Sequence, residues 1–191
     1  MARSYRRNGT PIGDRRVYVV TTKKRPCSVY EMSGVTTWEE ADASFELMRG
    51  MYQFGDDSMR DDLALVRPGA DLTQANLEDA NLERADLSGA ILCGVNFCIA
   101  DLTEARLCRA NFTDAYLEEA VFCGADFTGA DLTGARLMMA HLEDSDLTRV
   151  VFTGTDIKYV EFEGAIYPTG TVPPGWKRYT DPKGVVRLTS A

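Results

Sequence analysis

Few side chains of this sequence have the type and spacing that nucleophilic catalysis requires. The single histidine, His141, precedes Ser145 and Asp146, and these residue types could form a hydroxyl nucleophile with its base. Nothing nearby supplies an oxyanion pocket, and the glycines follow a five-residue register rather than forming a phosphate-binding loop. We therefore expect no enzymatic activity, no metal, no cofactor and no small-molecule substrate.

Charged side chains are unevenly distributed along the chain, and the chemistry they offer is electrostatic binding. Residues 1–25 hold eight basic residues against Asp14, whereas residues 70–164 hold eighteen acidic residues against six basic ones. The eight basic residues form what we call the basic arm: Arg3, Arg6, Arg7, Arg15, Arg16, Lys23, Lys24 and Arg25. The arm and the acidic region could each bind a macromolecule of opposite charge.

The acidic region repeats every five residues from 70 to 164, nineteen times without an insertion or a deletion. A bulky apolar residue occupies the third position of each unit, as in Leu72, Leu77 and Leu82. A small residue, mostly alanine, lies two positions earlier, Asp or Asn often lies between them, and glycine often ends the unit. Repetition at a fixed period is typical of a solenoid, which offers surfaces rather than a catalytic cleft.

The residue types explain a period of five. It fits neither a helix nor a long strand, but it fits a chain that runs extended for about three residues and then turns. Four units would close a square coil, with the bulky residue inside and glycine at corners that need positive φ. Asp or Asn before the bulky residue could bond nearby backbone and favour the turn. Coils about 4.8 Å apart would make a rod on the order of 23 Å long.

Assigning the units to four sides in rotation concentrates negative charge on one of them. We name the sides by their first bulky residues, Leu72, Leu77, Leu82 and Leu87. The Leu82 side holds seven acidic residues against Arg84, and we call these seven the acidic face: Glu83, Asp101, Glu104, Glu143, Asp144, Glu161 and Glu163. The Leu72 and Leu77 sides have a net charge of −3 each and the Leu87 side has none. Acidic residues that served only solubility would not need to gather on one side, so this bias favours a binding surface.

The order of small residue, Asp or Asn, Leu or Phe, and two variable residues resembles the pentapeptide repeat family over residues 70–164. The resemblance implies a mainly β protein, folded as a right-handed quadrilateral β-helix of about five coils. It also implies a role in binding, since the best understood members are DNA mimics that act on gyrase. This chain differs from those members in having fewer coils, no loop that interrupts the coil, and a 69-residue amino-terminal region.

The amino-terminal flank is expected to form a small α/β cap. Residues 17–22 and 27–32 have the composition of strands, and a capping box at Thr37 and Glu40 predicts a helix over 38–54. The apolar stripe of that helix would be Trp38, Ala41, Phe45, Met48 and Tyr52. A second short helix is expected over residues 58–66. We expect the helical stretch to cover the exposed end of the first coil.

The carboxy-terminal flank is expected to close the other end of the coil. The small position of the repeat changes in Ser145, Val150, Thr155 and Val160, so the final coil should be built differently. Residues 176–188 predict a hairpin, with Tyr167 and Trp176 as lids. The chain is thus divided into 1–69 (basic arm, strand and helical cap), 70–164 (repeat) and 165–191 (carboxy-terminal cap and hairpin).

Cysteine usage and hydropathy indicate the compartment. Four of the five cysteines (Cys93, Cys98, Cys108 and Cys123) fall on four different sides of the coil, and Cys27 precedes the repeat. Neither a disulfide ladder nor a metal cluster is expected, and reduced thiols favour a cytoplasmic protein, or a virion component if phage-encoded. No run of about eighteen apolar residues predicts a membrane span, and the arginine-rich start lacks the apolar stretch of a signal peptide.

Three functional interpretations follow. In the first, the acidic face binds a protein partner as a DNA mimic, with DNA gyrase or another DNA-binding protein as that partner. B-DNA carries one charge per about 1.7 Å, and the coil would carry −12 over roughly 23 Å. In the second, the chain is a structural or adaptor subunit of a larger assembly, and its basic arm contacts a neighbour or another copy in a homo-oligomer. The third is an interaction module of unknown target.

Overall fold

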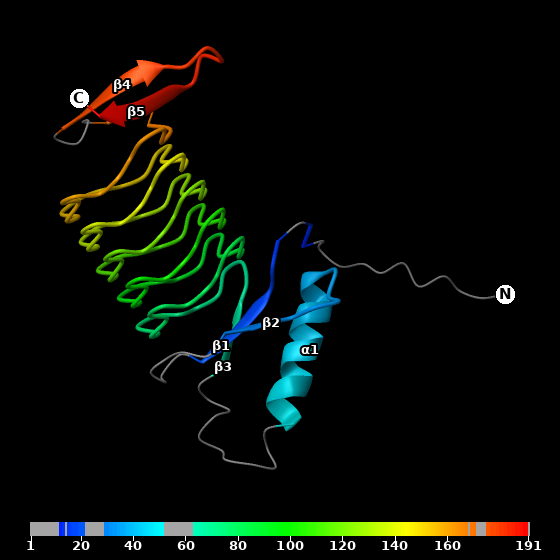
Figure 1. The fold of residues 1–191 in the computed structure, drawn as a ribbon. Coiled ribbons are helices and arrows are strands. Elements are labelled where there is room, and N and C mark those ends of the chain that lie inside the picture. The colour runs from blue at the N-terminus through cyan, green and yellow to red at the C-terminus, as the bar shows by residue number, and fades with distance from the viewer. Residues whose placement is uncertain are drawn as a thin grey trace.

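The repeat region winds into a stack of four-sided coils (Figure 1). The computed structural model describes residues 12–13, 15–21, 29–51, 63–167, 169–170 and 175–190. Parallel backbone bridges join residues twenty positions apart, beginning with Asp71 and Ile91 and continuing to Asp146 and Ile166. Twenty residues are four units, so each unit forms one side of a coil and the predicted square coil is confirmed.

Every corner of the coil has the same backbone conformation. The fifth residue of all nineteen units has positive φ, between 55° and 75°, and seven of these residues are glycine. In ten units the Asp or Asn side chain accepts the N–H two residues on, as Asp101 does from Thr103 at 2.9 Å. The small residue closes the corner, as the Ala105 N–H does by donating to the Leu102 carbonyl at 3.0 Å. The corners are thus satisfied locally, and the remaining backbone groups bond coil to coil.

The bulky residues fill the interior in stacked columns. Leu102, Phe122 and Leu142 are fully buried, as the square coil requires. Phenylalanine rings from neighbouring sides meet there, with centroids 5.0 Å apart for Phe122 and Phe127 and 5.7 Å apart for Phe112 and Phe127. Burying one such side chain contributes about 1.5–3 kcal/mol relative to leaving it exposed. The continuous column of buried side chains is therefore a principal source of stability.

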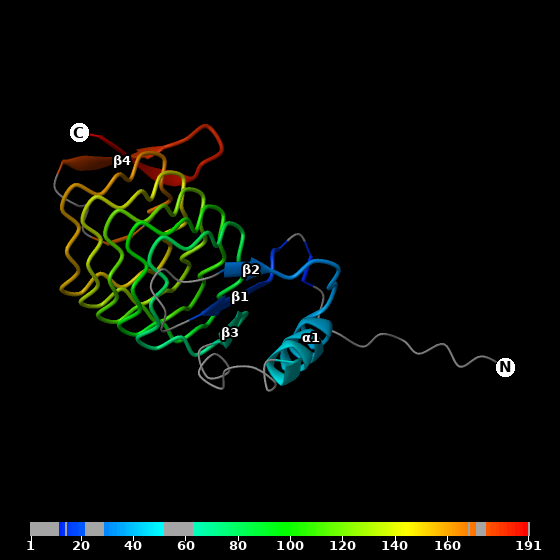
Figure 2. The same ribbon diagram turned by 60° about the horizontal axis from the view of Figure 1, so that its bottom comes forward.

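A three-stranded antiparallel sheet covers the first coil (Figure 2). It is formed by β1 (Tyr18–Thr21), β2 (Val29–Glu31) and β3 (Leu63–Val66), in the order β2-β1-β3. Side chains alternate across it. Tyr18, Val20 and Val66 join the core of the coil, whereas Val19 and Leu65 pack on the opposite face with Ala41 of helix α1 (Trp38–Met51).

Two expectations about this cap were wrong. The helix does not cover the first coil, because α1 packs on the far face of the sheet and the strands lie between. The expected second helix is instead strand β3 at residues 63–66, where Leu-Ala-Leu-Val pairs with β1; residues 58–62 lie outside the described residues. Pairing with a strand more than forty positions earlier in the chain overrides the local helical pattern.

The start of α1 follows its predicted capping box. The Thr37 hydroxyl accepts the Glu40 N–H at 3.2 Å, and the Glu40 carboxylate accepts the Thr36 N–H at 2.9 Å, one residue earlier than in the standard box. Trp38 and Phe45 pack on the sheet as expected. The Met48 side chain and residues 52–54 lie outside the described residues. Within that description, no helix has the length and apolarity needed to cross a membrane.

The predicted carboxy-terminal hairpin is confirmed, and it is hydrogen-bonded to the last coil. It consists of β4 (Trp176–Thr180) and β5 (Val186–Ser190), paired antiparallel. The Leu188 N–H donates to Ala165 at 2.8 Å, and the Tyr167 N–H donates to Val186 at 3.0 Å. Trp176 contacts Phe162 edge to face, with centroids 5.6 Å apart. Tyr167 lies in the interior column, so both expected lid residues cover part of the coil.

Candidate acidic binding face

The five layers of the acidic face lie directly above one another. Parallel bridges join the residues before each bulky residue in succession: Asn81, Asp101, Val121, His141 and Glu161. All seven acidic residues therefore project from one side of the coil, as the rotation of units predicted. The middle layer, Val121 to Gly124, carries no acid and divides the face into two clusters. The first cluster is Glu83, Asp101 and Glu104, and the second is Glu143, Asp144, Glu161 and Glu163.

The first cluster is partly occupied by the chain's own basic arm. Arg16 forms an ion pair with Glu83 at 3.5 Å, and its backbone is bridged to Ala85. The Arg15 guanidinium donates to the Glu104 carbonyl at 2.5 Å. These two arm residues therefore lie on their own coil. Placement of the other six (Arg3, Arg6, Arg7, Lys23, Lys24 and Arg25) lies outside the described residues.

Tyr18 completes this contact between β1 and the coil. Its hydroxyl donates to the Glu83 carbonyl at 2.8 Å. Burial raises the pKa of Tyr18 above its ordinary value, although Arg16 opposes the shift, so the phenol stays neutral. Hydrogen bonding to Tyr18, and then the charge of Glu83, raise the pKa of Arg16. Arg16 and Tyr18 therefore occupy the amino-terminal end of the acidic face, and this end is not an open surface.

The carboxy-terminal end of the face is also held by a flank. Glu163 accepts the Thr189 hydroxyl and the Ser190 N–H, each at 3.1 Å, from β5. Arg187 of the same strand lies 3.9 Å from Asp144. The hairpin therefore contributes a counter-charge to the second cluster.

The most accessible acids lie between these two contacts. The side chains of Glu104 and Asp144 are 62% and 78% exposed, and Glu161 is also exposed. Glu143 lies 3.1 Å from Nδ1 of His141. Asp101 differs from them, because its carboxylate builds the corner with Thr103. The carboxylates of Glu104, Glu143 and Glu161 thus take part in neither the turn nor the flank contacts, and Arg84 lies 3.5 Å from Glu104. Asp144 is more exposed than Glu104, with Arg187 at 3.9 Å.

His141 and Ser145, the residue types that could have formed a nucleophilic site, lie in different environments. Ser145 is fully buried and its hydroxyl donates to the Leu142 carbonyl at 2.7 Å, whereas His141 is exposed. The thiols of Cys98 and Cys123 lie 3.2 Å and 3.5 Å from glutamate oxygens of the next coil. Burial first, and then these glutamates, raise the pKa of both thiols to about 11, which makes them poor nucleophiles at neutral pH. Within the described residues, no three metal-ligating side chains form a cluster.

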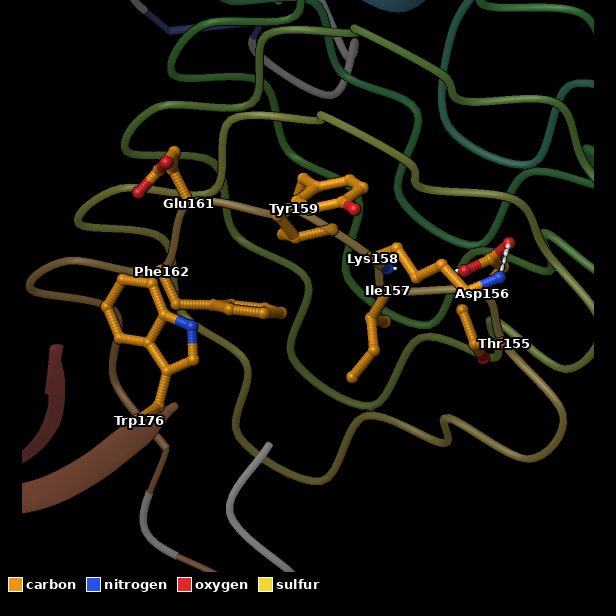
Figure 3. Close-up of a pocket in the computed structure, with 9 residues that line it drawn as sticks. Thr155, Asp156, Ile157, Lys158, Tyr159, Glu161, Phe162 and Trp176 are labelled. Carbon is orange, nitrogen blue, oxygen red and sulfur yellow. Dashed lines mark hydrogen bonds and ion pairs between the residues drawn. The ribbon is translucent and has the colours of Figure 1, made fainter. Parts of the chain in front are cut away.

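A pocket of about 520 Å³ opens where the last coil meets Trp176 (Figure 3). Ile157, Tyr159 and Phe162 line it. Of its three charged residues, Asp156 and Lys158 pair with each other at 3.6 Å, and Glu161 belongs to the acidic face. The pocket is the uncovered end of the apolar interior rather than a convergence of polar groups. Tyr159 was not predicted from the sequence, because it occupies the fifth position of its unit, which the repeat uses as a turn position; the signal for it is a large apolar residue where other corners carry glycine or a polar residue.

Comparisons with known proteins agree with this fold. The sequence profile described as Pentapeptide repeats matches residues 69–97, 100–137 and 140–166 in eight copies. None of the curated protein sequences compared with the chain matches it.

Solved structures of pentapeptide repeat proteins resemble about half of the chain. Rfr23, a pentapeptide repeat protein from the cyanobacterium Cyanothece 51142, is 25% identical, with a TM-score of 0.52 over 53% of this chain and 84% of that one. A pentapeptide repeat protein of the Arabidopsis thaliana thylakoid lumen is 31% identical, with a TM-score of 0.41 over 56% of this chain and 70% of that one. QnrB1, a plasmid-mediated fluoroquinolone resistance protein, is 21% identical, with a TM-score of 0.26 over 51% of this chain and 58% of that one.

The profile match, the first of these structures and the twenty-residue bridges all describe one architecture over one segment. The chain belongs to the pentapeptide repeat family, and its repeat region is a right-handed quadrilateral β-helix.

Proposed function

We propose that this protein is a non-catalytic binding protein that receives a basic partner on the central part of its acidic face. The observation that carries the proposal is the group of carboxylates at Glu104, Glu143, Asp144 and Glu161, all on one side of the coil. Glu143 is partly exposed and the other three are exposed. Pentapeptide repeat proteins are generally binding or structural proteins, so a function performed by the surface fits the family.

The rigid coil holds these carboxylates in fixed positions before a partner binds. Their backbone is fixed by hydrogen bonds between coils about 4.8 Å apart, so binding costs little ordering of the acidic partner. A protein that binds B-DNA presents basic groups to phosphates spaced about 1.7 Å apart along the axis. A fixed array of carboxylates could compete for such a surface. DNA gyrase, the target suggested by the family resemblance, is the first partner to test.

A matched pair of double variants tests the acidic face. The test variant is Glu104→Lys with Asp144→Lys, and the control is Asp79→Lys with Asp114→Lys. All four residues occupy the fifth position of a unit and have positive φ, but the control pair lies on two other sides of the coil. Both variants change the net charge equally, so a general charge effect would weaken both. We expect only the test variant to lose about tenfold or more in affinity.

The measurement is inhibition of gyrase supercoiling, followed by direct binding at two salt concentrations. Inhibition by the wild type that is lost in the test variant and weakened by salt would support the proposal. No inhibition at micromolar wild-type protein would exclude gyrase, and equal inhibition by both double variants would exclude the acidic face.

The alternative role, an assembly subunit that reaches neighbours with its basic arm, now depends on fewer residues. Arg15 and Arg16 contact their own coil, so this role rests on the other arm residues, which lie outside the described residues. Deleting residues 1–11 leaves β1 and the contacts of Arg15 and Arg16 in place. Light scattering of that variant tests the part of the arm that holds Arg3, Arg6 and Arg7, since binding of a neighbour by these residues requires a smaller assembly after the deletion.

A further inference from the structure

One corner of the coil carries exposed apolar side chains that the fold does not require. The fifth residues that follow the Leu77 side form this corner: Asp79, Ile99, Glu119, Met139 and Tyr159. Ile99, Met139 and Tyr159, which we call the apolar corner, are 54%, 44% and 77% exposed. At the other three corners every fifth residue is glycine, polar or charged.

The backbone disfavours these side chains where they stand. Their φ angles are 61°, 60° and 59°, in the left-handed region where a Cβ approaches the neighbouring carbonyl oxygen. A β-branched residue such as Ile99 is especially poorly suited to that region. The three side chains also remain largely in contact with solvent, so neither turn geometry nor packing accounts for their presence. A contact with another molecule accounts for both their size and their position.

The spacing of the apolar corner matches a helix. Adjacent coils are about 4.8 Å apart, so Ile99 and Met139 are separated by about 9.6 Å and Tyr159 lies about 4.8 Å further along. Residues i, i+7 and i+10 of a helix rise by about 10.5 Å and then about 4.5 Å along one side. Alternate residues of an extended strand recur only every 6.6 Å or so. The corner therefore fits the apolar stripe of a helix better than it fits a strand.

Charge defines the partner further. Glu119 lies between Ile99 and Met139 in the column, and Glu118 precedes it. The Leu77 side holds five acidic residues against Arg136 and Lys158, and the Arg136 guanidinium lies over the Tyr116 ring at 4.9 Å. A second copy would bring the same excess of acid against this side, so like charges disfavour self-association. A helix with basic residues between its apolar ones would be attracted.

We infer that the apolar corner binds a basic amphipathic helix about three turns long. The terminal apolar side chain of that helix contacts Tyr159. Tyr159 and Ile157 both line the pocket of about 520 Å³ at the last coil (Figure 3). This corner joins the Leu77 side to the Leu82 side, so it borders the acidic face, and Glu161 of that face also lines the pocket. The inference rests on the exposed apolar side chains and does not depend on the function proposed for the acids.

The probe is a labelled synthetic helical peptide with leucine at positions i, i+7 and i+10 and lysine at i+3 and i+4. A scrambled peptide of the same composition controls for charge alone. Fluorescence anisotropy should show binding of the patterned peptide that is about tenfold or more tighter than binding of the scrambled one. Equal affinity for the two peptides would overturn the inference.

The decisive variant replaces Ile99, Met139 and Tyr159 with glycine, which the positive φ favours. We expect an unchanged or higher melting temperature together with a loss of affinity for the patterned peptide of about tenfold or more. The control, Gln74→Gly with Arg109→Gly, makes the same replacement at other corners and should keep the affinity. Undiminished binding by the triple variant would overturn the inference.

Two further measurements cover other outcomes. Should the triple variant fail to fold, Glu119→Lys should still weaken binding of the lysine peptide by repulsion, and an unchanged affinity would refute the basic partner. Light scattering checks for a second copy. A wild-type dimer that the glycine replacements dissociate would show that another copy, and not a helix, covers the apolar corner.

Discussion

The two ends of the coil are closed by β-structure in different degrees. At the amino-terminal end a three-stranded sheet places Tyr18, Val20 and Val66 on the interior, and Leu72 is only 2% exposed. At the carboxy-terminal end a two-stranded hairpin covers Phe162, whereas Phe152 and Ile157 remain half-buried. A sheet wide enough to cross the coil closes it completely, and a hairpin bonded through one strand closes two sides of four.

The repeat itself loosens towards the open end. In earlier units the small residue donates to the preceding bulky residue at 2.8 to 3.2 Å, but this distance is 3.4 Å for Thr155 and for Val160. Residue size does not explain the difference, because Val95 at the same position of an earlier unit keeps a distance of 3.1 Å. The acceptors of the two long bonds are the carbonyls of Phe152 and Ile157, so the longer bonds occur at the residues that the hairpin leaves half-buried.

Burying a charge at the closed end should have the largest effect. Val20 is fully buried between the sheet and the first coil. Val20→Asp should cost about 4 kcal/mol in the free energy of unfolding, because the carboxylate would have no partner there. Urea denaturation measures this. The control is Val151→Asp, at a 43% exposed position before Phe152 where other units carry Asp. It should be neutral, and a similar cost for both variants would contradict the difference between the ends.

Truncating the interior at each end sharpens the comparison. Leu82→Ala should cost about 3 kcal/mol because Leu82 is fully buried near the closed end. Phe152→Ala should cost about 1–2 kcal/mol despite the larger side chain, since half-buried groups lose less on truncation. Both free energies come from denaturant unfolding. A cost for Phe152→Ala as large as for Leu82→Ala would mean that something closes the carboxy-terminal end in solution.

Removing the lid at the open end should have a smaller effect. Trp176→Ala deletes the edge-to-face contact with Phe162 and should cost about 1.5 kcal/mol in unfolding free energy. Tyr179→Ala, in the same strand at a 41% exposed position, should cost less than about 0.5 kcal/mol. If the two variants were equally stable, Trp176 would not act as a lid.

The coil was predictable from sequence because each position of the unit has one structural task. A residue such as Leu102 can only point inward, and Asp101 can build the corner without help from distant residues. The caps were less predictable, because β3 is a strand only through pairing with β1. The seven acids could be assigned to one side by counting. The contacts that Arg16 and Arg187 make with two of these acids could not be predicted, since they depend on how the flanks fold back onto the coil.

The smallest expected effect is a pH dependence confined to the hairpin at the open end. The Val185 N–H, and then Arg187, hold the pKa of Asp181 below its ordinary value. The ionised carboxylate therefore stabilises the fold above the unfolded pKa of about 3.9, and this contribution disappears as pH falls through the lower folded value. Asp181→Asn should lower the melting temperature at neutral pH, and the difference from wild type should shrink towards zero in acid.

Asp71 gives the matched control at the closed end. Hydrogen bonds from the Thr73 hydroxyl and N–H lower its pKa in the same direction. Asn can replace it with little loss, because Asn81 makes the equivalent bond to the Glu83 N–H at 3.2 Å. Asp71→Asn should therefore change the melting temperature less than Asp181→Asn at neutral pH. Melting curves between neutral and acid pH decide this, and a larger effect at Asp71 would mean that the repeat needs its carboxylates as charges and not only as acceptors.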